Sequence, residues 1–184
     1  MKSKCNFSVI AFLSLMLLLS GCGSAKLQDY AKETPQLRIE DFFVGETWGW
    51  GQVQDYTGRV TRQFQVKIQG HLEGETLILD EDFIYHDGRQ DQRRWTFEPL
   101  NENCYVGRAM DVRGQAEACQ AGNVFHMEYR LEVEIDEAIW VFTMDDWMYL
   151  QEDGLVINRT QMNKWGLTLG EITLFLSKQP FQAR

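Results

Sequence analysis

The sequence contains few prolines, few histidines and few basic residues, and these low counts limit the fold classes and the partners that the protein can have. Only three of the 184 residues are proline, which permits long strands because proline cannot donate to a sheet ladder. Lysine and arginine number 18 against 27 acidic residues, and no basic stretch is longer than Arg93-Arg94. Because affinity for nucleic acid depends on phosphate contacts from lysine and arginine, we expect no nucleic-acid partner.

Motifs of common catalytic sites are also missing. The chain has no P-loop, no dinucleotide-binding fingerprint and no Gly-x-Ser-x-Gly sequence, and its three histidines do not have metal-ligand spacing. The pair Asp145-Asp146 does not form one acid site in a strand, because neighbouring side chains point to opposite faces. We expect one of the two to face outward and the other to pair with an inner arginine such as Arg159. No catalytic residue, metal or cofactor is therefore predicted.

The N-terminus, by contrast, contains a clear targeting motif. Lys2 and Lys4 precede an apolar run at 7–19, and small residues follow it, which is the pattern of a secretory signal peptide. The run is shorter than the roughly 20 apolar residues of a spanning helix. The four residues Leu19-Ser20-Gly21-Cys22 resemble the lipobox of bacterial lipoproteins, in which cleavage precedes the cysteine and its thiol carries a diacylglyceryl group. We expect residues 1–21 to be removed and Cys22 to be acylated.

This processing predicts where the protein resides. Two or more acyl chains give stable anchoring, whereas one is marginal, so the lipidated chain is expected to stay on a membrane of the cell envelope. Gly23 stands where an aspartate would resemble an inner-membrane retention signal, and this indicates the periplasmic face of the outer membrane. Removing residues 1–21 takes away two basic residues and no acidic one, which leaves a net charge of −11.

Cysteine usage agrees with export. Cys5 leaves with the signal and Cys22 is acylated, so Cys104 and Cys119 remain. In an oxidising compartment two such thiols are candidates for a disulfide, and these two flank a predicted hairpin. The alternative is a pair of free buried cysteines that act as small apolar side chains.

Alternation of apolar and polar residues dominates the rest of the chain. From Phe125 to Ile135 every second residue is apolar, and the residues between are charged or His126, as in a half-buried strand. Glycine-containing turn signals such as Asp87-Gly88 separate such runs. Residues 39–43 are expected to form a short helical turn. The other predicted strands are 48–54, 60–68, 77–85, 93–97, 105–112, 139–144, 155–162 and 168–176.

Regular strands joined by short turns predict an all-β, antiparallel meander of roughly eight to ten strands. Closing into a barrel removes the exposed edges of such a sheet, and a barrel of about eight strands can hold one small ligand. We therefore expect one barrel domain at 38–178, preceded by a tether at 22–37 and followed by a tail at 179–184.

Several segments together resemble a known family. The resemblance extends over about 37–178 and is to a domain-of-unknown-function family of bacterial lipoproteins. It implies an envelope location and a lipocalin-like β architecture, and it supplies no catalytic residues. Cys104 and Cys119 lie outside the shared pattern. The segments that carry the resemblance are Phe43-Val44-Gly45, Gln54-Asp55-Tyr56-Thr57-Gly58-Arg59-Val60, Phe83-Ile84-Tyr85-His86-Asp87-Gly88, Asp145-Asp146-Trp147-Met148 and Asn158-Arg159-Thr160.

Four charged residues share a strand parity with apolar neighbours: Arg62, Glu81, Arg93 and Arg159. Charges are seldom buried without a partner, so one interpretation is internal salt bridges or positions at the barrel rim. The other is that one or more arginines face a cavity and bind an anionic head group such as a carboxylate, which the planar guanidinium suits.

Three functions are compatible with these observations. The leading hypothesis is an anchored, non-enzymatic binding or carrier module for a small apolar or amphipathic, lipid-like ligand. The alternative is a structural or assembly factor that contacts another envelope protein. An enzyme that uses an inward Glu81 or Asp145 is the weakest hypothesis, because no catalytic constellation supports it.

Overall fold

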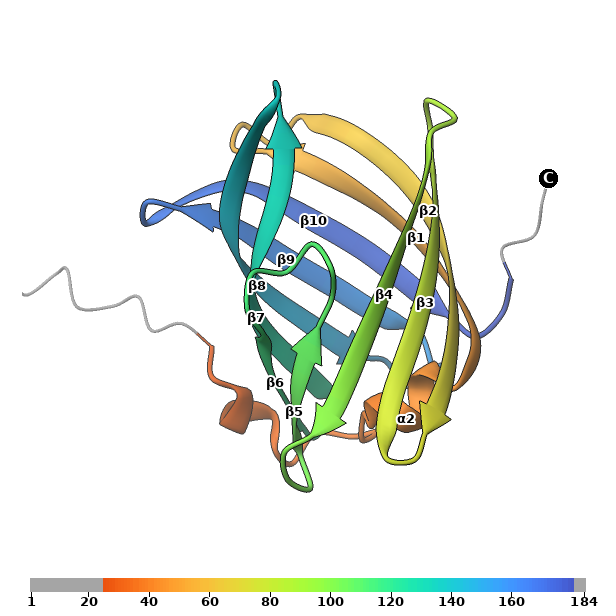
Figure 1. The fold of residues 1–184 in the computed structure, drawn as a ribbon. Helices are drawn as coiled ribbons and strands as arrows, with labels where there is room; N and C mark the ends of the chain where they lie inside the picture. The colour runs from red at the N-terminus through yellow and green to blue at the C-terminus, as the bar shows by residue number, and fades with distance from the viewer. Residues whose placement is uncertain (1–24, 181–184) are drawn as a thin grey trace, which may run out of the picture.

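The protein is described by a computed structural model that covers residues 25–180 (Figure 1). The predicted signal segment 1–21, the predicted acylation site Cys22 and residues 181–184 lie outside the described residues. No helix within 25–180 has the length and apolar character needed to cross a membrane.

Ten antiparallel strands form one closed barrel in which each strand lies beside its neighbours in sequence and β1 closes onto β10 (Figure 1). This confirms the predicted all-β meander that closes into a barrel. The strands are β1 (Gly45–Asp55), β2 (Val60–Glu73), β3 (Thr76–Tyr85), β4 (Gln90–Pro99), β5 (Cys104–Arg108), β6 (Ala116–Ala121), β7 (Val124–Ile135), β8 (Ala138–Leu150), β9 (Val156–Lys164) and β10 (Leu167–Ser177).

A short helix, α2 (Ile39–Phe43), lies at one end of the barrel, as predicted for these residues (Figure 1). Its side chains Ile39, Phe42 and Phe43 are buried in the core. The helix approaches β2 at Gly70, where an added Cβ would lie 2.0 Å from the backbone oxygen of Phe43. Only glycine permits this contact without a backbone shift, so Gly70 helps α2 to fit against the barrel.

The segment before α2 packs on the outside of the barrel. It contains the 3-10 helix η2 (Leu27–Tyr30), and the ring of Tyr30 lies against the β8 side chains Trp147 and Tyr149. Further along, Leu37 is buried and its N–H donates a hydrogen bond to the carbonyl of Gly122. The described part of the predicted tether is therefore in contact with the barrel.

The observed strands of the barrel differ from the predicted ones at β5 and β6. The strand predicted at 105–112 ends at Arg108, and β6 was not among the predicted strands, because alanine and small polar residues give it a weak pattern. Both strands are short, so β4 pairs with β5 only from Thr96 onward. Cys104 and Cys119 stand directly opposite one another on β5 and β6 and form a disulfide.

The interior is filled mainly by apolar side chains near α2. Buried Leu77, Trp95, Phe125, Met144 and Leu176 come from strands around the whole barrel. Toward the end away from α2 the inward residues become half-buried. The barrel thus has a packed end and a more accessible end.

Candidate functional site

A cluster of polar side chains lies inside the barrel, on the inner faces of β3 and β4 and in the loop after β5. Glu81 and Arg93 are directly opposite one another in the β3–β4 pair, and Arg93 Nε donates a hydrogen bond of 2.8 Å to Glu81 Oε2. Arg93 Nη1 also lies 3.5 Å from Asp111 Oδ2. Arg93 therefore bridges two carboxylates at the inner wall.

The second part of the cluster comes from β8 and β9. Asp146 is only 5% exposed, and it accepts hydrogen bonds from the Asn158 amide and the Thr160 hydroxyl. Asn158 Nδ2 also donates to the backbone carbonyl of Trp147 at 3.1 Å. Burial raises the pKa of Asp146 to about 6, because the carboxylate loses solvation that these hydrogen bonds and the positive charge of Arg93 only partly replace.

The protonation of the other members follows from their surroundings. Burial raises the pKa of Tyr129 on β7, so its phenol stays neutral. Burial lowers the pKa of Arg93, but the nearby carboxylates of Glu81 and Asp111 raise it by more. Arg93 is consequently always charged. The cluster therefore combines one permanent positive charge with three carboxyl groups, those of Glu81, Asp111 and Asp146.

A cavity of about 70 Å³ adjoins this cluster. One water molecule needs about 10–15 Å³ of such space, so the cavity has room for several waters or for one end of a larger molecule. Of the cluster, Glu81, Arg93, Tyr129, Asp146 and Asn158 line this cavity, whereas Asp111 does not. The lining combines the polar cluster with apolar side chains, among them Phe43, Leu79, Trp95, Met127 and Leu174.

Half-buried apolar side chains continue from the cavity toward the accessible end of the barrel. Phe83, Tyr85, Leu131 and Trp140 all pack against the edge of the core and are partly exposed. Arg62 lies at this end, on the inner parity of β2, and its guanidinium is 5.3 Å from the ring centre of Tyr85. Arg62 is thus a solvent-exposed rim residue.

The structure brings together two of the four charged residues predicted from parity, Glu81 and Arg93, as an internal salt bridge. The prediction that Arg159 lies on the inner face is wrong. Arg159 lies on the outer face of β9, and its Nη2 is 2.6 Å from Glu171 Oε2. The prediction assumed that apolar Ile157, which shares a parity with Arg159, faces inward. The inner residues are instead Asn158 and its alternate neighbours, because buried Asp146 needs their hydrogen bonds.

The two adjacent aspartates point to opposite faces, as strand geometry requires. Asp146 faces inward, and its partners are Asn158 and Thr160 rather than the expected Arg159. Asp145 faces outward. The sequence places Asn158 and Thr160 in a segment of the family resemblance but does not assign them, or Tyr129, to an interior site, because that role depends on cross-strand register, which a single sequence does not reveal.

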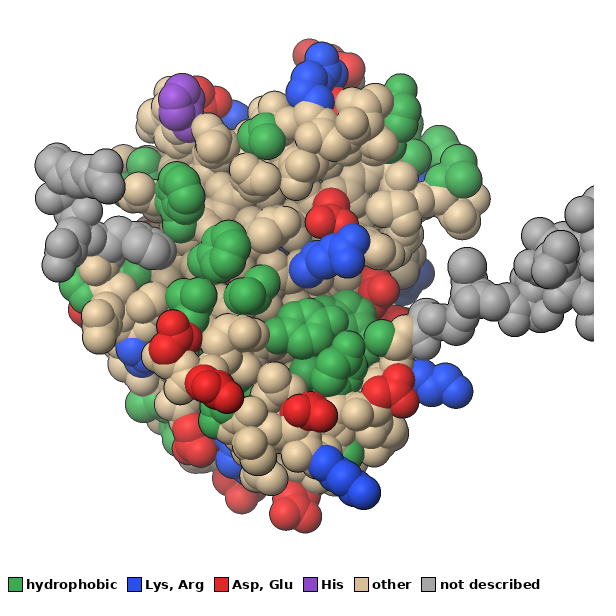
Figure 2. Space-filling view, turned by 180° about the vertical axis from the view of Figure 1, so that it is seen from behind, with side chains coloured by type: hydrophobic (Ala, Val, Ile, Leu, Met, Phe, Trp, Pro, Cys, Tyr) green, Lys and Arg blue, Asp and Glu red, His purple; other side chains and the backbone are tan. Residues whose placement is uncertain are grey.

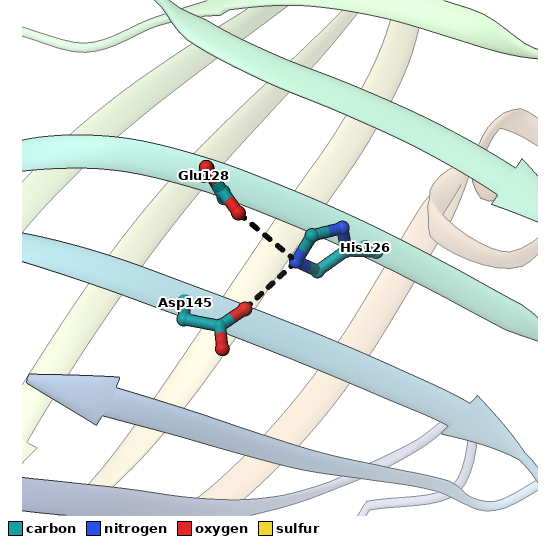
Figure 3. A group of neighbouring side chains, drawn as sticks. All are labelled: His126, Glu128 and Asp145. Atoms are coloured by element: carbon teal, nitrogen blue, oxygen red, sulfur yellow. Dashed lines mark hydrogen bonds and ion pairs between the residues drawn. The ribbon is translucent and has the colours of Figure 1, made fainter. Parts of the chain in front are cut away.

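On the outer face, Asp145 belongs to a group with His126 and Glu128 (Figure 3). His126 Nε2 lies 2.7 Å from Asp145 Oδ1 and 4.0 Å from Glu128 Oε1. One nitrogen and two oxygens are ligand types that zinc accepts. However, Trp147 Nε1 also donates to Asp145 Oδ1 at 2.7 Å, and the His126 ring stacks on Trp147. These contacts account for the arrangement, and Glu128 is largely exposed, so we assign no metal to it.

Comparison with known sequences places the chain in a family. Residues 16–178 match the family described as "Protein of unknown function (DUF3833)". The chain belongs to the DUF3833 family. None of the curated proteins matches it.

Among solved structures, this DUF3833 barrel is similar to the S-type phycobiliprotein lyase of Guillardia theta. The TM-score is 0.55 at 6% sequence identity, and the match covers 88% of this chain and 100% of the lyase chain. At such low identity the likeness concerns the fold alone. It confirms the lipocalin-like architecture that the family resemblance implies.

Proposed function

We propose that this protein is a membrane-anchored binding module that holds the polar end of a small amphipathic molecule inside its barrel. The observation that supports this most directly is the charged cluster of Glu81, Arg93 and Asp146 in a mainly apolar interior. A buried ion pair adds little stability, and apolar residues of similar volume often serve as well or better. A cluster that costs solvation and lies beside a cavity is therefore better explained by binding than by folding.

The charge of the cluster favours a particular ligand chemistry. Arg93 is already neutralised by Glu81 and Asp111, and Asp146 adds negative charge. The carboxyl groups of Glu81 and Asp146 line the cavity, and their oxygen atoms accept hydrogen bonds. A neutral or cationic group that donates hydrogen bonds, such as a hydroxyl or an amine, fits this site better than a carboxylate does.

The apolar part of the ligand would lie toward the accessible end of the barrel. The cavity of about 70 Å³ is much smaller than ligand pockets of about 300–1,000 Å³, so it would hold only the polar end. The half-buried side chains Phe83, Tyr85 and Trp140 would cover the remainder. A lipid-like molecule with a small donor group has this division of polar and apolar parts.

The proposed location follows from the N-terminal sequence. The lipobox at 19–22 supports acylation of Cys22 and anchoring at the cell envelope, on the periplasmic face of the outer membrane. The disulfide between Cys104 and Cys119 is compatible with an oxidising compartment. A protein held there by acyl chains would meet membrane-partitioned molecules at high local concentration.

Ligand retention tests the binding proposal. The full chain is purified from its membrane in mild detergent, and co-purifying molecules are identified by mass spectrometry. The variant Glu81→Gln with Arg93→Met removes both charges, because removing one alone would leave its partner buried and unpaired. The matched control, Glu171→Gln with Arg159→Met, makes the same change to the outer-face pair.

We expect a bound species in the wild type and the control, and a loss of about tenfold or more in the inner variant, which corresponds to about 1.4 kcal/mol of binding free energy. Equal retention by all three proteins would contradict the proposal. A wild type that retains nothing would also contradict it, and would favour a role as a structural or assembly factor that contacts another envelope protein.

The anchor is tested separately by growth with labelled palmitate. Cys22→Ser should abolish incorporation of label, because it removes the only thiol at the predicted cleavage site. Cys5→Ser is the control, since Cys5 lies in the segment that is removed, and it should not change labelling of the mature chain. Continued labelling of Cys22→Ser would exclude acylation at this residue.

A further inference from the structure

A continuous row of apolar side chains crosses the outer surface of four neighbouring strands. Trp50 on β1 is directly opposite Phe175 on β10, Phe175 is opposite Ile157 on β9, and Ile157 is opposite Tyr149 on β8. Trp50 is 52% exposed and Phe175 39%. Figure 2 shows hydrophobic side chains gathered on this side of the molecule. We call this surface the aromatic face; it comprises Tyr30, Trp48, Trp50, Trp147, Tyr149, Ile157 and Phe175.

The aromatic face is not part of the barrel core. On β9 the residue that points outward is the apolar Ile157, whereas polar Asn158 points inward. Val156 and Met162 on the same strand do face the core, so the exchange of an apolar for a polar side chain is confined to the middle of its inner face. Contiguous exposed apolar patches mark interaction surfaces, and tryptophan and tyrosine in particular are enriched where protein meets the membrane–water boundary.

The start of the described chain lies at the same face. The Tyr30 ring is 5.7 Å from the ring centre of Tyr149 and 6.2 Å from that of Trp147. Cys22 precedes Lys26 by four residues, which span at most about 14 Å when fully extended. An acyl anchor on Cys22 would therefore lie within about 14 Å of Lys26, which precedes Tyr30 of the aromatic face by four residues.

We propose that the aromatic face rests on a zwitterionic phospholipid surface and orients the barrel on its membrane. This inference rests on the proposed anchoring at Cys22, which brings that face to the bilayer. The choice of a zwitterionic surface follows from charge, because a chain with a mature net charge of −11 is repelled by anionic lipid. Trp50 and Phe175 enter the headgroup region, and the anchor and the face bind together.

The test omits the anchor so that the face is measured alone. Residues 25–180 contain every strand of the closed barrel and its core, so a chain that begins at Gly23 keeps the whole fold. Binding is measured by co-sedimentation with vesicles of phosphatidylcholine and phosphatidylethanolamine. A second vesicle set contains phosphatidylglycerol. Circular dichroism and a thermal melt of each protein verify that it is folded.

The face variant is Trp50→Ser with Phe175→Ser. Its matched control is Tyr56→Ser with Ile84→Ser, which removes two apolar side chains that are 78% and 52% exposed elsewhere. We expect the face variant to lose about tenfold or more of the vesicle partition coefficient and the control to stay within about twofold, in line with the apolar area each side chain would transfer. Anionic lipid should weaken binding of every protein.

Three results would overturn the proposal: no binding of the unsubstituted chain to zwitterionic vesicles, equal loss in the face variant and the control, or a face variant that turns a dimer into a monomer without altering vesicle binding. The last result would identify the aromatic face as a contact between two copies. Because the assay contains neither the anchor nor the barrel ligand, its failure is distinct from failure of the palmitate or ligand-retention experiments.

Discussion

Asp146 should make the folded protein less stable as pH rises. Its carboxyl is 5% exposed, and burial raises its pKa from an ordinary 3.8 to about 6. Between these values the folded state binds more protons than the unfolded state, so the free energy of unfolding falls as pH increases. The stabilising contribution is full below about pH 4 and is lost above about pH 6. A shift of roughly two pKa units corresponds to about 3 kcal/mol.

Asp146→Asn isolates this effect. The amide is neutral in both states, and its oxygen can still accept the hydrogen bond from Asn158. Relative to wild type, the variant should gain up to about 3 kcal/mol of unfolding free energy as pH rises from about 4 to 7, measured by urea denaturation. Asp145→Asn is the control, because it removes a charge from the outer face without changing the interior. A difference between wild type and Asp146→Asn that does not vary with pH would refute the reasoning.

Two further predictions concern the disulfide and the N-terminal segment. Replacing Cys104 and Cys119 by alanine should lower the free energy of unfolding by about 2–4 kcal/mol, because their bond closes a loop with a sequence separation of 15; a loss below about 1 kcal/mol in urea denaturation would contradict this. Gly122→Ala should displace the chain at Tyr30 and speed its proteolysis there, since Gly122 has φ +54° and an added Cβ would lie 1.8 Å from the Tyr30 oxygen. Gly74→Ala is the control, with φ +64° but open space around it, and equal protease sensitivity of the two variants would count against the contact.

The strands with the strongest alternation could be predicted from sequence. In β7 from Phe125 onward each inward residue is apolar and each outward residue is polar, because one face is directed at the interior and the other at water. β6 could not be predicted, because Ala116, Ala118 and Ala121 are small and give little difference in hydrophobicity between the two faces of the strand. Its existence depends on pairing with β5 and β7, including the disulfide, and such long-range pairing leaves no local pattern.

The interior site was predictable only in part. Arg93 could be placed inside from its parity with Trp95, and Glu81 from its parity with Leu79. That the two form one ion pair follows from the β3–β4 register, which their separation of twelve residues does not specify. Arg159 was predicted to lie inside from its parity with Leu155 and Ile157, and this prediction is wrong, because the inner face of β9 is the one that contains Val156 and Met162.

The reversal on β9 connects the two surfaces for which we propose functions. Asn158 hydrogen-bonds inward to Asp146 and to the backbone carbonyl of Trp147, whose side chain lies outside beneath Tyr30. Ile157, the preceding residue, belongs to the aromatic face. A strand that served only the core would have placed Ile157 inside and left a polar residue outside. Val156 and Met162 still face the core, so the exchange is confined to positions 157 and 158. A ligand bound inside and lipid contacted outside would account for both side chains of this exchange.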